Sequence, residues 1–233
     1  MKKITSLLLL LVLTLTGCHW ILFTGALIFK GNDTPPEFDI LFRDKKTEKR
    51  VAVVPRTIYS NAYELQNAPQ EIAQRVNQLL EEHVRNNARP NQKNTKLHII
   101  EQSKVEAWLD NCNNTFDDFV EVGRDKSLKA DIVIGFDIIN FQIRDPQNPY
   151  LMQGKCTVQV KAFDCATGDE LASKTLTITD PPNGQIPVSH PNADALFRQQ
   201  FARVVVAEQI AALFHYHDKH KLQRIDADSL GMH

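Results

Sequence analysis

The segment ADIVIGFDIINFQIRD, residues Ala130–Asp145, determines the fold more than any other part of the chain. It is rich in β-branched and aromatic residues, which favour strands, and Pro146 ends it. Its apolar residues are too continuous to leave a side for water. The segment therefore predicts one long strand that is buried on both faces.

Two further strands are expected directly after it, within residues 150–178. The sequence CATGD supplies the turn between them through Gly168. Just before this turn, polar Thr157, Gln159 and Lys161 alternate with apolar residues. Because successive side chains of a strand point to opposite faces, one face of this hairpin should be wet.

Helices and strands alternate in the first half of the domain. Apolar periodicity predicts, in chain order, a strand at 48–55, a helix at 67–87, a strand at 96–102, helices at 104–110 and 116–128, and, after the hairpin, a helix at 193–217. Asn67 is the expected cap of the first helix, and Ser103 with Glu106 forms a capping box for the second. The order β-α-β-α-α-β-β-β-α predicts the α/β class, with helices packed on a single mixed sheet. Its early strands should be parallel and its late hairpins antiparallel.

The chain begins with the layout of an export signal. Lys2 and Lys3 precede a nearly unbroken apolar run from Ile4 to Leu15. The next residues, LTGC, end at Cys18 and resemble a bacterial lipobox, in which a small residue precedes the cysteine that receives lipid. We therefore expect a signal peptide at 1–17 and a lipid anchor on Cys18.

Two alternatives to this anchor stay open. The apolar residues continue to Phe29, and a run of this length could instead span a bilayer as an uncleaved helix. Cys18 could also be an ordinary cysteine behind a secretory signal. With either a lipid anchor or an uncleaved helix, the rest of the chain lies outside the cytoplasm, tethered to a membrane, because basic residues at the start stay on the cytoplasmic side.

The expected domain organisation follows from this start. Residues 18–47 form the lipid-anchored apolar segment and a tether with consecutive prolines, 48–217 form one α/β periplasmic domain, and 218–233 form a polar tail. Loss of residues 1–17 would leave 25 basic residues against 28 acidic ones, and thus a formal net charge of −3, where the full chain has −1. This mild acidity argues against a nucleic-acid partner, which would require a clustered basic face.

Metal and disulfide chemistry have weak support. Cys156 and Cys165 stand nine residues apart on one expected strand, about 30 Å at the rise of an extended chain, so any bridge must include Cys112. Buried, unpaired cysteines are the expectation. The sequence HYHDKH at 215–220 contains possible metal ligands, yet its place at a helix end suits cationic residues for dipole reasons, so we expect no metal site.

Recognised enzyme motifs are missing from the sequence. It contains no GxSxG elbow, no phosphate-binding glycine loop, no GxGxxG and no HExxH. Asp131, Asp137 and Asp164 could be carboxylates at strand ends, but no partner base accompanies them in the sequence. We expect no catalytic residues and no cofactor, and the pattern favours a binding or scaffold protein.

Several motifs together resemble the envelope lipoproteins related to the curli-secretion lipoprotein, the penicillin-binding-protein activator lipoproteins and the N-terminal domain of the Tol-system translocation protein. In that group a helix leads into an Ala-Asp-x-Val-x-Gly strand, matched here by Ala130, Asp131, Val133 and Gly135. The turn of the following hairpin is matched by Asp164, Thr167, Gly168 and Asp169. The likeness spans about residues 50–214, and its motifs are short.

This resemblance implies a periplasmic domain that acts by contact with other envelope proteins. By the same resemblance, His19 after the cysteine permits transfer to the outer membrane, with the inner membrane as the alternative. The loop from Asp180 to Pro191 departs from the group and could bind a partner, through Asp180, Asn183 and Gln185. We expect a non-enzymatic accessory or assembly factor with an envelope protein partner, and a homo-oligomer is left open. A self-assembling secretion-channel subunit is the first alternative and an unrecognised envelope hydrolase the second.

Overall fold

The computed structural model describes residues 33–41, 47–58, 65–87, 97–113, 115–145, 147–182, 186–187 and 193–218. The chain divides into two compact units. In the smaller unit, the short strands β1 (Asp33–Thr34) and β8 (His217–Asp218) pair antiparallel. The larger unit, residues 36–215 with 222–233, contains the α/β domain described below. Cys18 and the expected signal peptide lie outside the described residues.

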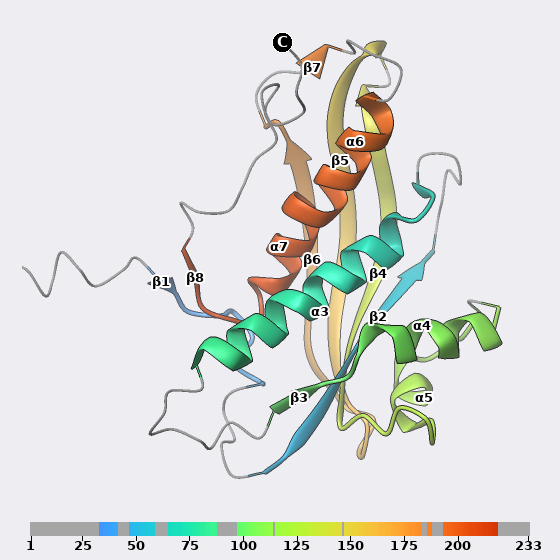
Figure 1. Ribbon diagram of the computed structural model, residues 1–233, viewed down its shortest axis with the longest axis vertical. Helices are drawn as coiled ribbons and strands as arrows, with labels where there is room; N and C mark the ends of the chain where they lie inside the picture. The colour runs from blue at the N-terminus through green and yellow to red at the C-terminus, as the bar shows by residue number, and fades with distance from the viewer. Residues whose placement is uncertain are drawn as a thin grey trace, which may run out of the picture. The chain divides into compact units, whose positions relative to one another are not determined.

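One mixed sheet organises this domain (Figure 1). Its strands, in spatial order, are β3 (Leu97–Ile99), β2 (Lys49–Thr57), β4 (Ile132–Asp145), β5 (Asn148–Asp164) and β6 (Glu170–Asp180), with the short β7 (Ile186–Pro187) paired to β5. Strand β2 runs parallel to β3 and β4, while β4, β5 and β6 form an antiparallel meander. The fold class expected from the sequence is confirmed.

Strand β4 is the centre of the sheet, as its apolar sequence predicts. All residues from Ile132 to Ile138 are buried. Beyond a shift of register between Ile138 and Asn140, however, the strand alternates between buried and half-buried residues. The prediction of a strand buried on both faces therefore holds for the first half of β4. It is wrong for the second half, where helices cover only one of the two faces.

Helices cover one face of the sheet, which we call the inner face. They are α3 (Ala68–Asn87), α6 (Ala193–Gln200), the π-helical stretch η1 (Phe201–Val206) and α7 (Ala207–Ala211), and they lie side by side over the strands (Figure 1). Apolar side chains of these helices and of alternate strand residues form the main core. In α3, Ile72, Val76 and Leu80 face this core, in agreement with the predicted amphipathic helix.

The last helix is shorter than predicted, because it ends at Ala211 and not at 217. The N–H groups of Leu213 and Phe214 donate to the carbonyls three residues earlier, those of Ile210 and Ala211, and these bonds tighten its final turn. The carbonyl of Leu213 then accepts a bond of 2.8 Å from the N–H of Phe38. An N-terminal segment thus takes the bond that a longer helix would have formed.

Two small helices, α4 (Gln102–Asn111) and α5 (Phe119–Arg124), pack through a second hydrophobic cluster on the other side of β2 and β4. The predicted capping box is wrong: the N-cap of α4 is Glu101, without a side-chain bond. Helix α5 is also shorter than the predicted 116–128, because the Asp118 carboxylate accepts the N–H of Val120 and starts the helix there.

Residues 36–41 pack on the domain. Leu41 is only 2% exposed within the main core, and the rings of Phe38 and Phe214 lie 5.5 Å apart. The folded unit therefore includes residues that the sequence analysis assigned to the tether. The helices that the structure describes are all too short or too polar to span a bilayer.

Candidate functional site

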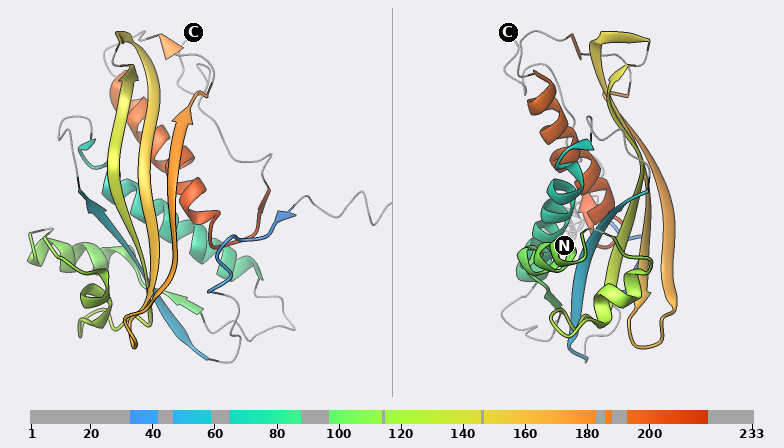
Figure 2. Two further views of the ribbon diagram at one scale, coloured as in Figure 1. Left: turned by 180° about the vertical axis from the view of Figure 1, so that it is seen from behind. Right: turned by 90° about the vertical axis from the view of Figure 1, so that its right-hand side faces the viewer.

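We call the side of β4, β5 and β6 that faces away from α3, α6 and α7 the outer face; α5 covers the first half of β4 on this side. Seen from behind, β5 and β6 lie in front of α3, α6 and α7 (Figure 2), and α5 contacts the end of β5, where Phe163 stacks on Phe119. On β5, apolar Val158, Val160 and Ala162 point to the core with 0% exposure, while the residues between them are half-buried. The expected wet face of this hairpin is therefore confirmed.

Strand register arranges the outer face into cross-strand rows, and the row nearest α5 is Val133, Phe163 and Glu170, of which Glu170 is exposed. Four further rows follow. From α5 toward the β4–β5 turn, they are Gly135, Lys161 and Ser173; Asp137, Gln159 and Thr175; Asn140, Thr157 and Thr177; and Gln142, Lys155 and Thr179. Hydroxyl and amide groups dominate these rows, and they can donate and accept hydrogen bonds. The face is thus polar.

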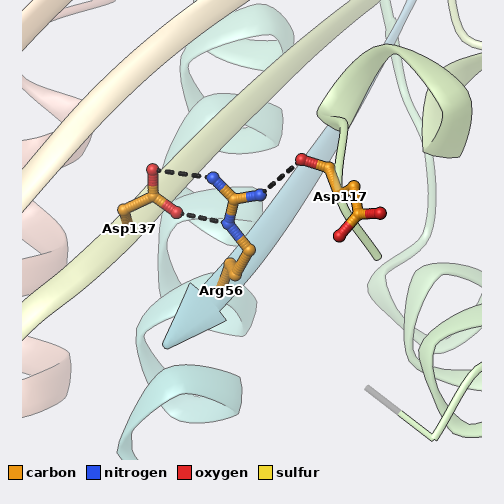
Figure 3. Close-up of polar contacts among 3 residues, drawn as sticks. All are labelled: Arg56, Asp117 and Asp137. Carbon is orange, nitrogen blue, oxygen red and sulfur yellow. Dashed lines mark hydrogen bonds and ion pairs between the residues drawn. The ribbon is translucent and has the colours of Figure 1, made fainter. Parts of the chain in front are cut away.

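Arg56 lies on β2 beside Asp137 of β4 and bonds to it (Figure 3). Its Nε donates to Asp137 Oδ1 at 2.6 Å, Nη2 donates to Asp137 Oδ2 at 3.1 Å, and Nη1 donates to the carbonyl of Asp117 at 2.8 Å. The guanidinium also lies over the rings of Phe119 and Phe116, 4.5 and 5.5 Å from their centroids.

These bonds explain how the one carboxylate on the four rows, that of Asp137, can be buried. Asp137 is 1% exposed, and a buried carboxylate is costly unless it is paired. Every nitrogen of the Arg56 guanidinium already donates to a protein oxygen. Arg56 and Asp137 therefore hold the segment before α5 against the sheet, and three of the five guanidinium N–H groups are used in these bonds.

The motif residues that suggested the resemblance dock α5 on the sheet. A Cβ atom at Gly135 would lie 2.5 Å from Cδ1 of Phe119, so only glycine leaves room for this ring. A Cβ atom at Gly123 in α5 would lie 2.3 Å from Sγ of Cys165. Asp131 Oδ2 accepts the N–H of Arg50 at 2.7 Å and so joins β4 to β2. These contacts give the motif around Ala130–Gly135 a structural role.

The residues of the expected turn bond to one another. Asp164 Oδ1 accepts hydrogen bonds from the N–H groups of Ala166 and Thr167 at 2.8 and 3.2 Å. The carbonyl oxygen of Asp164 accepts a bond from the N–H of Gly168 at 2.8 Å. Gly168 has φ = +87°, a conformation that side chains disfavour. The N–H of Asp169 donates to Thr167 Oγ1 at 3.2 Å. The β5–β6 turn is therefore a structural element, and Arg124 of α5 also holds it by donating to the carbonyls of Cys165 and Ala166.

The candidate binding residues of the loop after β6 are only partly described. Asp180, the last residue of β6, is 1% exposed and turned toward the inner face, so it is not available on the surface. It precedes Pro181 through a cis peptide bond, and Gln153 Nε2 donates to the carbonyl of Pro181 at 3.2 Å. Asn183 and Gln185 lie outside the described residues.

Cys112, Cys156 and Cys165 are free thiols, and the expected burial holds for Cys156 and Cys165, whereas Cys112 is half-buried. Burial raises the pKa of Cys156 to about 12. The pKa of Cys165 is raised to about 11, by burial and then by the charges of Asp164 and Asp131. Because the thiolate is the reactive form, these two thiols are chemically quiet in the folded protein.

The histidines of HYHDKH are not gathered into a metal site within the described ranges. His215 stacks on His83 of α3, with 5.0 Å between ring centroids, and His217 belongs to β8. The pKa of His83 is lowered to about 4 by burial and by the neighbouring His215. His220 lies outside the described residues.

An acidic hollow of about 340 Å³ lies between α3 and α4. Its lining is Asn67, Gln70, Glu71, Gln74, Glu106, Leu109 and Asp110. Burial raises the pKa of Glu71, against the opposing effect of Arg203 and Arg198. Gln74 Nε2 donates to Glu106 Oε1 at 3.0 Å across the hollow. Three carboxylates, those of Glu71, Glu106 and Asp110, therefore line this hollow, and Arg203 and Arg198 act on Glu71.

The chain matches no protein-family model and no curated protein. Among solved structures it is similar to lipoprotein GNA1162 from Neisseria meningitidis, with 13% identity, 70% of this chain and 98% of that chain covered, and a TM-score of 0.42. It is also similar to the PelC dodecamer from Paraburkholderia phytofirmans, with 12% identity, 74% and 91% covered, and a TM-score of 0.39.

A third similar structure is the LpoB C-terminal domain from Salmonella enterica, with 14% identity, 57% of this chain and 84% of that chain covered, and a TM-score of 0.29. Lipoproteins are thus represented among the structures that this chain is similar to, as the sequence motifs led us to expect. Identities and TM-scores this low carry no property of those proteins over to this one.

Proposed function

We propose that this chain is a lipid-anchored accessory or assembly factor of the bacterial cell envelope, which acts by binding an envelope protein on its outer face. The observation that carries this proposal is the uncovered part of the sheet. Three long strands present four polar rows there, while their other side is buried under helices. Binding residues are often displayed on such a rigid scaffold.

The anchor belongs to the same proposal. Lipid on Cys18 would tether the domain at a membrane surface, in the outer membrane or alternatively the inner one. Radioactive palmitate should label the unchanged chain, and replacement of Cys18 by alanine should abolish that label. Absence of label from the unchanged chain in the membrane fraction would instead support an uncleaved helix at 4–29.

The loop at 180–191 is a second proposed contact, through Asn183 and Gln185. Asp180 is better left in place in its test, since this residue is buried. Replacement of residues 183–185 by glycines should weaken partner recovery while the thermal unfolding midpoint is retained. Full recovery would remove the loop from the proposal and leave the outer face.

The function as a whole is tested by formaldehyde crosslinking in intact cells, followed by purification through a C-terminal tag and mass spectrometry. A discrete envelope protein in stoichiometric yield supports the accessory role. A ladder that contains only this chain would contradict it and favour self-assembly.

A further inference from the structure

The four outer rows contain more cationic than anionic side chains. Lys155 and Lys161 are their two cationic residues, and Asp137 is their one carboxylate. That carboxylate is 1% exposed and already neutralised by two bonds from Arg56. What the rows present to a partner is therefore two ammonium groups among hydroxyls and amides.

These four rows differ in charge from the adjoining row beside α5, where Glu170 is exposed, and from the rest of the molecule. The formal charge of the whole chain is −1, and the hollow between α3 and α4 is lined by Glu71, Glu106 and Asp110. Charge segregated in this way orients an approaching charged partner. It would draw an anionic surface toward the outer face and away from α3 and α4.

The spacing of the two lysines indicates the size of the partner. They stand six residues apart on β5, which corresponds to about 20 Å along a strand. A small anion cannot reach both ammonium groups. An extended acidic surface can, and its uncharged groups would meet Thr157 and Gln159 between the lysines.

The chemistry of the rows favours a protein over an acidic sugar polymer. The four rows contain no aromatic side chain on which a sugar ring could stack. Phe163, at the end of β5, already stacks on Phe119 with 6.0 Å between centroids. Hydroxyl and amide groups are suited instead to the mixed donors and acceptors of a protein surface.

We infer that the partner bound on the outer face is a protein with an acidic surface, and that Lys155 and Lys161 are its main electrostatic contacts. This inference rests on the proposed function and adds the chemical class of the partner. Charge complementarity of this kind acts largely on the association rate, and it is screened by salt. Binding should therefore weaken as ionic strength rises.

The test uses the full chain with charge reversal at both positions, Lys155→Glu and Lys161→Glu. The matched control is Lys104→Glu with Lys126→Glu, which changes the net charge equally at exposed positions outside the rows. The probe in solution is fluorescein-labelled poly-L-glutamate, followed by anisotropy. We expect the reversal to weaken binding about tenfold or more and the control to change it less than about twofold.

Two outcomes in solution would overturn the inference: equal binding of the probe by both double variants, or tighter, lysine-dependent binding of polygalacturonate, which would assign an acidic glycan. In cells, a photoreactive amino acid at position 175 is combined with each double variant. If the adduct with the partner persists undiminished after charge reversal, the acidic-partner inference fails while the proposed function stands. If no adduct forms even with both lysines in place, the proposed contact on the outer face itself fails.

Discussion

The ring of Phe119 occupies the space where a side chain at Gly135 would stand, with only 2.5 Å between Cδ1 of Phe119 and an ideal Cβ at position 135. Through this contact α5 rests directly on the backbone of β4. Phe119 in turn supports the Arg56 guanidinium, which holds Asp137. One glycine in the middle of a strand thus places the helix that borders the outer face.

Gly135→Ala should destabilise the domain by about 1–3 kcal/mol, the usual cost of an overpacked core. Phe119 is 2% exposed, so its ring has little room to move away. The measurement is urea unfolding followed by circular dichroism. The control is Thr175→Ala at an exposed strand position, with an expected change within about 0.5 kcal/mol. Equal midpoints for the two variants would contradict the close packing of α5.

A second glycine allows a double-mutant test on the inner face. A Cβ at Gly154 would lie 2.5 Å from the ring of Phe201 in η1. Gly154→Ala alone should cost about 1–3 kcal/mol. Combined with Phe201→Leu it should cost less than the sum of the two single changes, because the smaller side chain relieves the clash. Strict additivity would show that the two residues do not touch.

The pair of Arg56 and Asp137 should be among the most sensitive polar contacts of the fold. Arg56→Gln leaves the carboxylate of Asp137 buried without its cation, which costs about 3 kcal/mol for a pair of this kind. Lys104→Gln breaks the exposed pair with Glu101 and should cost less than about 1 kcal/mol. Similar unfolding free energies for the two variants would show that Asp137 is better solvated than its 2% side-chain exposure indicates.

Stability should fall as the pH is lowered from about 6.5 toward about 4, through the range between the ordinary and the folded pKa of His83. The folded state binds this proton less readily than the unfolded state, so protonation favours unfolding. The contribution should be about 1–2 kcal/mol, since the ring is only half-buried and solvent screens it. His83→Gln should flatten this part of the stability profile, whereas His98→Gln, at an exposed position of β3, should leave it unchanged. A parallel loss of stability in all three proteins would contradict the assignment.

Alkylation should distinguish the thiols by burial. Iodoacetamide should leave Cys156 and Cys165 unmodified in the native protein and should modify both in urea, because burial keeps them protonated. Cys112, which is half-buried, is the thiol expected to react first. Peptide mass spectrometry provides the readout. Fast native modification of Cys156 would require an opening of the core beneath η1.

The sheet could be predicted from local patterns, but the side-chain contacts between its parallel strands β2 and β4 could not. The periodicity of two in 157–162 and of 3.6 in 67–87 reports burial directly, and these elements agree with the structure. Arg56 and Asp137, by contrast, are 81 residues apart and meet only because β2 and β4 are parallel in this register. The sequence shows Asp137 as a carboxylate without a partner, and only the register identifies the partner.

The predicted ends of two helices were wrong for related reasons. The stretch 116–128 contains enough apolar residues for a longer helix, yet the aromatic contacts of Phe116 and the bond from Arg56 to the carbonyl of Asp117 hold its start in a non-helical form. The final helix ends where Phe38, from a segment that looked like a tether, reaches it. In both places a tertiary contact decided the boundary, and such contacts leave no periodic signal.

The most direct test of the account is site-specific photocrosslinking in intact cells, with a photoreactive amino acid at Thr175 on the outer face or, as the matched control, at the exposed Gln78 on α3. We expect a discrete adduct with one envelope protein from position 175 and none of that adduct from position 78. The same adduct from position 78 alone, or from neither position, would contradict the claim that the outer face binds the partner.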